Sequence, residues 1–298
     1  MREYVGRGNF TWFFGVVEDR NDPVQLGRVR VRAYGYHSDN KDQIPTDQLP
    51  WAVPLNGVDS AAISGVGISP TGMVEGSWVV GFFMDGDRAQ EPAILGTLSG
   101  VPSQLADTSL GFNDPKGIYP KYIDKSDVNE LARGDYVPPV ENAGKIGAPN
   151  TPYAAQYPYN HVRATESGHY TEFDDTPNAE RIKEFHKSGT LYEVHPTGDK
   201  VTRVVKDNYS LVAGDDKLHV KGNVTIFVDG DTNLTVAGTT TVDTPLTNWT
   251  GNINLTGDLD ITGKSTASVD HISSGISGKG HTHKDTPGLG AGDTSKPQ

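Results

Sequence analysis

The sequence predicts an all-β protein in which a small closed barrel is followed by a β-helix built from several chains. Two observations support this prediction. The 298 residues include 35 glycines and few helix-favouring stretches, which is typical of turn-rich β proteins. A glycine-ended repeat of fixed short period then runs through the C-terminal part of the chain, and such periods indicate a solenoid or β-helix.

The composition excludes or disfavours several classes of function. The chain has no cysteine, so disulfides, thiolate catalysis and Cys-based zinc sites are excluded. The formal net charge is −12 and the acidic residues are spread evenly, which disfavours generic nucleic-acid binding. We also expect no targeting segment and no membrane span, since no apolar run approaches the ~20 residues that cross a bilayer.

Residues 1–100 have the pattern of a compact β domain. Apolar-rich or alternating stretches, separated by turn clusters, predict strands at 10–18, 26–32, 78–84 and from 91. Several short strands at these spacings suit a small closed barrel. The second stretch places valines on one face and arginines on the other. The arginine face could bind a ligand, but we expect it to be solvated or to contact another subunit.

The next two segments differ in composition. Residues 101–152 contain seven prolines, which predicts a linker with at most one short helix, at 124–133. Residues 153–210 resume alternation in short segments that each have one apolar face. We interpret this region as the lead into the β-helix.

The repeats occupy residues 211–265. Val-x-Gly triplets recur at a spacing of eight and end at Gly214, Gly222, Gly230 and Gly238. The spacing then falls to six, with triplets ending at Gly251, Gly257 and Gly263. Each repeat reads as a short strand ended by a glycine, which permits the positive φ of a sharp turn.

In a single chain, such repeats would leave the backbone groups of the sheet edge unpaired and the apolar face exposed to water. Three identical chains around a common axis remove both, because each contributes one wall of a prism and pairs its strands with its neighbours. The polar residues between the apolar positions would face water. The repeats therefore predict a stiff, narrow homotrimeric shaft.

Residues 266–298 carry a possible metal site at His281 and His283. Two residues apart in an extended segment, both imidazoles face the same way. Three chains would supply six nitrogens, which suits iron(II), cobalt or nickel better than tetrahedral zinc. The alternative interpretation, without a metal, is a pair of solvated histidines. We read the other histidines as surface or turn residues: His37, His161, His169, His186, His195, His219 and His271.

In this order, the segments resemble the central spike proteins of contractile-tail bacteriophage baseplates. The similarity is carried by Gly15-Val16-Val17, Leu26-Gly27-Arg28-Val29-Arg30-Val31, Leu49-Pro50-Trp51, Phe83-Met84-Asp85-Gly86-Asp87, Gly168 to Pro177, the Val-x-Gly octads and Gly280-His281-Thr282-His283. The resemblance implies an N-terminal OB-fold barrel followed by an intertwined trimeric β-helix with a metal-bound tip, where the metal is an iron ion on the trimer axis.

The same resemblance implies a function and partners. The barrel would dock on a baseplate hub protein and the tail tube, within the virion. The tip would be pressed transiently through the host outer membrane when the sheath contracts. Some members of this family carry a lysozyme domain, but the 101–152 interval is too short for one. We read Glu130, Asp135 and Glu141 as solvating charges and expect no enzyme activity.

Four alternatives stay open at this point. The chain is also compatible with the spike of a type VI or other contractile injection system, although such spikes usually carry a hub domain on the same chain. A trimeric receptor-binding tail fibre is a second alternative, against which the OB-like N-terminus argues. A lytic enzyme and an OB-type nucleic-acid binder are the weaker two, the last because aromatic stripes with flanking lysines are missing.

Overall fold

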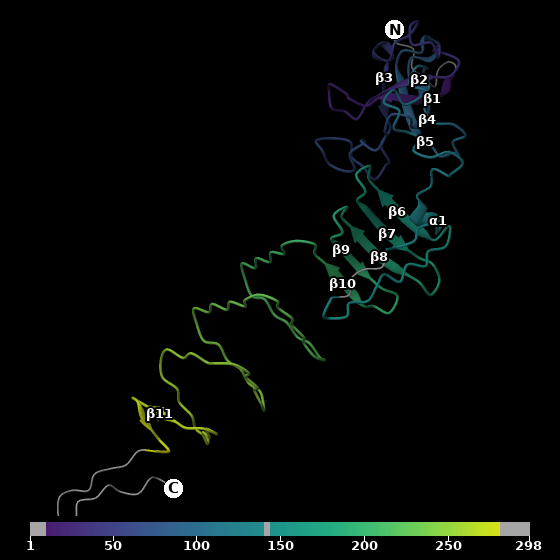
Figure 1. Ribbon diagram of the computed structural model, residues 1–298. Helices are drawn as coiled ribbons and strands as arrows, with labels where there is room; N and C mark the ends of the chain where they lie inside the picture. Colours follow the sequence, from purple (N-terminus) through teal and green to yellow (C-terminus); the bar gives the residue numbers. More distant parts are fainter. Residues whose placement is uncertain (1–9, 140–143, 281–298) are drawn as a thin grey trace, which may run out of the picture. The chain divides into compact units, whose positions relative to one another are not determined.

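The computed structural model describes residues 10–139 and 144–280, and Figure 1 shows it as a ribbon. These residues are almost all strand, turn or extended chain, with one four-residue α-helix. The chain divides into two units after Asp229. Within the described ranges, no helix has the length and apolarity needed to cross a membrane.

The first unit begins with five strands that close into a barrel in the order β1-β2-β3-β5-β4. β3 and β5 run parallel, and the other neighbours are antiparallel. The barrel also carries two 3₁₀ turns, Thr46–Gln48 and Gly86–Arg88. The strands are β1 (Trp12–Asp19), β2 (Val29–Ala33), β3 (Trp51–Pro54), β4 (Trp78–Phe83) and β5 (Pro92–Leu98).

The barrel closes around an apolar core. Alternate residues of each strand point inward, as the period of two in a strand requires. Gly81 is needed where β4 approaches β5, because a Cβ there would collide with the carbonyl oxygen of Ala93. The core residues are Phe13, Val17, Val29, Val31, Ala33, Ala52, Val79, Phe83 and Ile94.

The chain that follows the barrel folds back onto it. The backbone N–H of Phe112 donates to Oε1 of Glu18 at 2.8 Å, and the Phe112 ring stacks on Tyr34 with centroids 3.9 Å apart. Asp114 accepts backbone N–H groups of Ile118 and Tyr119, at 2.8 and 3.0 Å. Residues 110–119 are therefore an ordered part of the barrel's surface.

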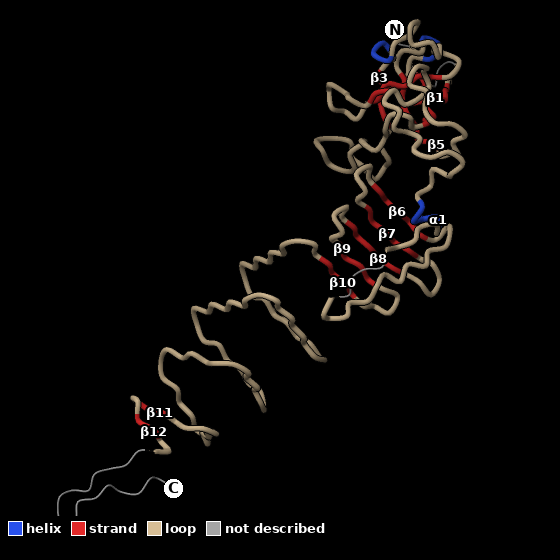
Figure 2. Tube along the Cα trace, viewed as in Figure 1, coloured by secondary structure: helices blue, strands red, loops and turns tan. Residues whose placement is uncertain are grey.

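A five-stranded antiparallel sheet follows, in the order β10-β9-β8-β7-β6, and Figure 2 shows its strands side by side in red. The short helix α1 (Glu130–Arg133) precedes it and is capped by the Asn129 side chain, which accepts from Leu131 N at 2.9 Å. The strands are β6 (Asn160–Ala164), β7 (Tyr170–Asp174), β8 (Arg181–Phe185), β9 (Leu191–Val194) and β10 (Lys200–Arg203).

Beyond β10 the chain is extended and lacks regular pairing. The structure assigns no strand to residues 204–271, drawn as tan loop in Figure 2. A small hairpin of β11 (Ile272–Ser273) and β12 (Ile276–Ser277) follows. The expected shaft strands are thus not formed within one chain, and the β-helix stays a prediction.

Candidate assembly surfaces

The arginine side of β2 is not a solvated stripe. Arg32 is 0 % exposed. Its guanidinium binds Glu18 with Nε–Oε1 at 2.6 Å and Nη2–Oε2 at 3.1 Å, and donates to the carbonyls of Ser38 and Ile44. The expectation of a solvated or subunit-facing stripe is therefore wrong for Arg32, because residues 110–112 return to cover this part of the strand.

The other two arginines are partly exposed and also have partners within the barrel. Arg28 pairs with Asp22, with Nη2–Oδ1 at 2.7 Å, and this bond lowers the pKa of the Asp22 carboxyl. Arg30 lies over the Trp51 ring, with its Cζ 4.5 Å from the ring centroid. The alternating Val-Arg pattern thus correctly predicted the two faces of the strand but not what covers them.

One face of the β6–β10 sheet buries charge. Arg181, on β8, binds Glu172 with Nη2–Oε2 at 2.8 Å and Glu193 with Nη1–Oε1 at 2.9 Å. All three side chains are almost fully buried, as are Asp174 and Lys183 beside them. Such a cluster is tolerated in the interior only when its charges are paired and hydrogen-bonded.

The chain's own upstream segment covers this charged face. Thr151 donates its hydroxyl to Oε1 of Glu193 at 2.6 Å, and Asn160 donates to the carbonyl of Leu131 at 3.0 Å. The Arg181 guanidinium lies over the Tyr153 ring at 5.1 Å. Burial raises the pKa of Tyr153 to about 12, so its hydroxyl stays protonated and donates to Leu131 O.

His195 belongs to the same buried cluster. It is nearly inaccessible, and its Nε2 lies 3.5 Å from Oε2 of Glu193. Our interpretation of His195 is correct in that it opens the β9–β10 turn, where its N–H donates to Asp199 O and its carbonyl accepts from Gly198 N, but His195 is not a surface residue. The sequence lacked a signal for this burial, because His195 follows the last alternating residue of β9 and the neighbouring Glu193 is covered by Thr151, which lies 42 residues upstream.

The charged face makes the sheet sensitive to acid. Burial alone would raise the pKa of Glu193, but Thr151, Lys183 and Arg181 outweigh it and the pKa lies below its usual value. A lowered folded-state pKa gives stability that is present above about pH 4.3 and is lost as the pH falls further. We expect the protection factors of the β8 and β9 amides, which correct for the intrinsic exchange rate at each pH, to fall below that pH.

The control for this prediction lies on the same sheet. In Glu193→Gln the acid-dependent part of the exchange should shrink, although the sheet is less stable at neutral pH. Glu184→Gln, on the exposed face of β8, should keep the wild-type pH dependence. Equal acid dependence in wild type and Glu193→Gln would contradict the assignment.

The opposite face of this sheet is open and carries a short apolar row among polar side chains such as His161 and Glu184. Phe173 and Ile182 are register partners, and they are 58 % and 45 % exposed. Val194 pairs with Ile182 on β9, which extends the apolar row across a third strand. The sheet thus buries a charged cluster on one side and leaves an apolar row exposed on the other.

The repeat segment has the same property along its whole length. Every residue from 204 to 269 is exposed, and the octad positions Leu218 and Ile226 are 83 % and 78 % exposed. Among the described residues, the backbone of 206–270 makes no backbone–backbone hydrogen bond. Both the apolar side chains and the peptide groups of this segment lack the cover that stable structure requires.

The repeat glycines fall into two groups. Gly251 and Gly257 have φ values of +121° and +134°, in the region that favours glycine. For the others, no left-handed φ is found, and a Cβ would meet nothing within 4 Å in the single chain; these are Gly214, Gly222, Gly230, Gly238 and Gly263.

The predicted metal ligands His281 and His283 lie outside the described residues. Within the ranges that are described, no group of three or more His, Asp or Glu side chains is arranged to hold an ion. Glu130 and Asp135 are exposed, and Asp135 pairs with Arg133 at 2.7 Å, while Glu141 also lies outside the described residues.

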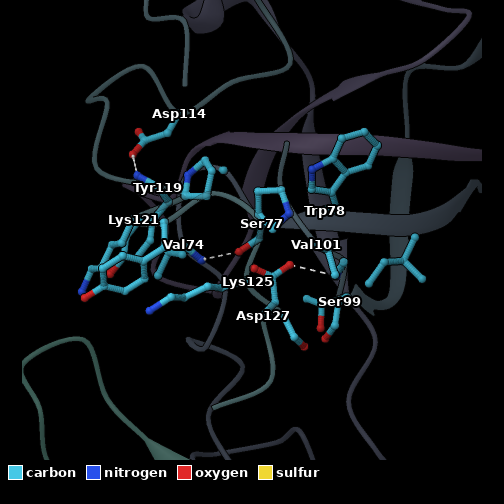
Figure 3. A pocket seen from close by; sticks show the side chains of 18 of the residues that line it. Val74, Ser77, Trp78, Ser99, Val101, Asp114, Tyr119, Lys121, Lys125 and Asp127 are labelled. Atoms are coloured by element: carbon cyan, nitrogen blue, oxygen red, sulfur yellow. Dashed lines mark hydrogen bonds between the residues drawn. The ribbon is translucent and has the colours of Figure 1, made fainter. Parts of the chain in front are cut away.

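A cleft of about 1560 Å³ lies on the first unit, lined by residues from the barrel, the 99–136 segment and the β6–β7 turn. Figure 3 shows its wall, with Trp78, Lys121 and Lys125 around it. Its carboxylates hold the backbone: Asp127 accepts from Gly100 N at 2.8 Å, and Asp114 from Tyr119 N. These carboxylates of the cleft therefore have a structural role, because they hold the backbone around it in place.

A closed five-stranded barrel of this strand order is an OB fold, and here it is joined to a repeat array whose apolar residues have no cover in one chain. The fold and the exposed surfaces thus define a class of protein in which a small barrel is joined to a segment that needs cover from other chains. Residues 35–183 match the family described as the Gp5 N-terminal OB domain. The chain belongs to this Gp5 family, which confirms the predicted barrel.

Two curated relatives are similar to the chain. Protein Gp5 of Vibrio phage KVP40 is 40% identical over 276 residues, which cover 76% of this chain and 65% of that protein. The pre-baseplate central spike protein Gp5 of Enterobacteria phage T4 is 44% identical over 134 residues, which cover 43% of this chain and 23% of that protein. The chain thus spans less than two thirds of either relative.

Proposed function

We propose that the chain is the central spike of a contractile phage baseplate and works as a homotrimer. The relatives named Gp5, one of them a pre-baseplate central spike protein, support a baseplate spike role and a place in the virion. The observation that carries the trimer is the repeat segment, whose apolar side chains and peptide groups are uncovered in one chain. Two further copies supply both the apolar contacts and the strand partners.

The apolar row on the β6–β10 sheet supports the same assembly. The charged face of the sheet is already covered by the chain's own residues 131–155, so only the opposite face, which carries the apolar row, is available for another copy. The row of Phe173, Ile182 and Val194 then packs toward the trimer axis, just before the octads begin.

The mass of the chain in solution tests this proposal directly. Sedimentation equilibrium should give a single species of three times the 32.0 kDa chain mass. Because the trimer interface is also the shaft's core, this species should persist on dilution. A stable monomer with a folded repeat segment would end the proposal.

The mechanical role follows from the shaft. Continuous strand pairing along an axis and a dry core give stiffness, which a structure pressed through the host outer membrane during sheath contraction needs. The barrel mounts the shaft on a hub protein and the tail tube. This work needs no catalytic residue, so we propose that the protein is not an enzyme.

The absence of hydrolase activity is open to a direct assay. The purified trimer should release no soluble products from peptidoglycan. Turnover that is abolished by Glu130→Gln or Glu141→Gln would overturn the proposal.

The tip proposal concerns His281 and His283. In a trimer these residues supply six neutral imidazole nitrogens, a donor set that fits an octahedral iron ion. Such an ion would tie the three chains together beyond the repeats.

We expect metal analysis of the purified trimer to give one iron per three chains. The His281→Ala/His283→Ala variant should lose the metal but keep the trimer mass, since the shaft does not depend on the tip. His161→Ala, on the exposed face of β6, is the matched control and should keep the metal. Metal retained in the double variant would refute the assignment.

A further inference from the structure

An arginine at the end of the first barrel strand is shared between the barrel and the β6–β10 sheet. Arg20 follows β1 directly, and its Nε lies 3.1 Å from Oε2 of Glu75, a buried residue of the loop that leads into β4. The other carboxylate oxygen of Glu75 accepts from Lys116 Nζ at 2.8 Å. Glu75 is therefore held in place itself, and it fixes the Arg20 guanidinium from the barrel side.

The free edge of the same guanidinium faces the turn between β6 and β7. Nη1 of Arg20 donates to Oε2 of Glu166 at 2.6 Å, and Nη2 donates to Oε1 at 3.2 Å. The Tyr119 hydroxyl donates to the same Oε1 at 3.0 Å. The bond to Arg20 keeps the pKa of Glu166 below its usual value, so this carboxyl group is ionised at neutral pH. Three donors thus converge on one carboxylate of the sheet.

This ion pair is better organised than most exposed ones. A lone exposed pair stabilises little, because two long side chains must be ordered for a weak attraction in water. Here the contact is bidentate, and Glu75 has already ordered Arg20, whose side chain is 33 % exposed. Only the Glu166 side chain, which is 46 % exposed, loses much freedom when the pair forms. The contact is prepared on the barrel and completed by the sheet.

The pair joins two parts of the first unit that share no strand. Among the described residues, the barrel strands pair only with one another, and so do the strands of the β6–β10 sheet. The described part of the chain between them, within residues 99–159, contains the short helix α1 and no strand. Regular structure therefore does not fix the sheet to the barrel. The cleft opens beside the pair, and both Tyr119, seen in Figure 3, and Glu166 line it.

We propose that Arg20 and Glu166 form a latch that seats the β6–β7 turn on the barrel and limits the width of the cleft. While the latch is closed, the barrel and the sheet move as one body. The latch opens at Glu166, because Arg20 stays bound to Glu75, and the sheet then moves relative to the barrel on the connecting chain. A force applied to the barrel thus reaches the sheet through a direct contact as well as through the backbone.

A distance measurement between two spin labels tests the latch on the full chain, which has no native cysteine. Val24→Cys, in the β1–β2 loop, and Lys187→Cys, in the β8–β9 turn, place the labels at exposed positions. Co-expression with an excess of the cysteine-free chain restricts the measurement to label pairs within one chain. Double electron–electron resonance should give one narrow distance. Glu166→Ala should lose it and give a broad distribution, because the barrel's donors no longer have a carboxylate to hold.

The matched control is Glu180→Ala, which removes an exposed glutamate from the turn between β7 and β8, at the other end of the sheet. It should keep the narrow distance. Tyr119→Phe removes one of the three donors and should broaden the distribution less than Glu166→Ala does. Arg20→Ala is not used, because it would also leave buried Glu75 without one of its cations.

Salt distinguishes the latch from a general structural role of Glu166. At 1 M salt the screening length falls to about 3 Å, so the wild-type distribution should broaden toward that of Glu166→Ala. The Glu166→Ala distribution itself should not respond to salt, because its latch is already open.

The outcomes also separate the latch from the proposed spike function, since the latch lies within one chain. A distance that stays narrow in Glu166→Ala overturns the latch and leaves the spike intact. Equal broadening in Glu180→Ala shows a general loosening of the sheet and also overturns it. A monomer by sedimentation that keeps the narrow distance, and loses it in Glu166→Ala, supports the latch and removes the trimer instead.

Discussion

Replacing Arg32 with alanine is expected to destabilise the barrel by about 3–5 kcal/mol. The substitution leaves Glu18 buried without its counter-charge, although Thr46 and Phe112 still donate to it. It also frees the carbonyls of Ser38 and Ile44, which Arg32 satisfies. Urea unfolding followed by tryptophan fluorescence measures the effect, because three of the four tryptophans lie in the barrel.

Two further variants make this result specific. Arg28→Ala breaks the more exposed pair with Asp22 and should cost roughly 1 kcal/mol or less. The double variant Glu18→Leu/Arg32→Met removes both charges and should recover most of the loss, as apolar replacements of buried pairs do. A cost for Arg32→Ala no larger than that for Arg28→Ala would contradict its role in closing the barrel.

Placing a charge in the apolar row of the repeats should dissolve the trimer. Ile226→Asp introduces three carboxylates into the proposed shaft core, and an unpaired buried charge costs several kcal/mol in each chain. Sedimentation equilibrium should show dissociation to the single-chain mass. Thr225→Asp is the matched control, because adjacent side chains of an extended segment point to opposite sides and the Thr225 position should stay in water.

The two substitutions therefore distinguish a buried face from an exposed one within a single repeat. Dissociation by Ile226→Asp alone identifies the apolar row as the interface. A trimer that survives Ile226→Asp would mean that the repeats are held by something other than their apolar positions.

The local signals of the sequence were sufficient for most of the barrel. Strict alternation in Val29 to Arg32 and the turn clusters beside it predict strands that the structure confirms. β3 was not predicted, because four residues ending in proline carry too short a pattern. The helix expected within 124–133 is present as α1.

What the sequence did not reveal is what covers each face. Alternation indicates that Glu172 and Phe173 point to opposite sides of β7, and the usual expectation puts the phenylalanine inside. In the structure the phenylalanine is exposed and the glutamate is buried, because Thr151, Tyr153 and α1 lie over the charged side. Long-range cover of this kind leaves no periodic trace. The same reason explains why the burial of Arg32 and of His195 was not predicted.

The candidate sites differ in the same way, because some follow from a local sequence pattern and others only from long-range contacts. The Val-x-Gly period is visible in the sequence and led to the shaft prediction, whereas the buried Arg181 cluster appears only once the strands of the β6–β10 sheet are paired. His281 and His283 were found by spacing alone and stay a prediction.

The anchoring of Phe112 and Lys116 to the barrel bears on how such proteins diversify. Buried Glu18 depends on the Phe112 amide, and Lys116 Nζ lies 2.8 Å from Oε1 of buried Glu75. A recombination event that joins this barrel to a different shaft must therefore keep the sequence through Lys116. A crossover placed at the end of β5 would leave a buried carboxylate without one of its donors. We therefore expect the natural seam between exchangeable modules to fall after Lys116, well downstream of the last barrel strand, which ends at Leu98.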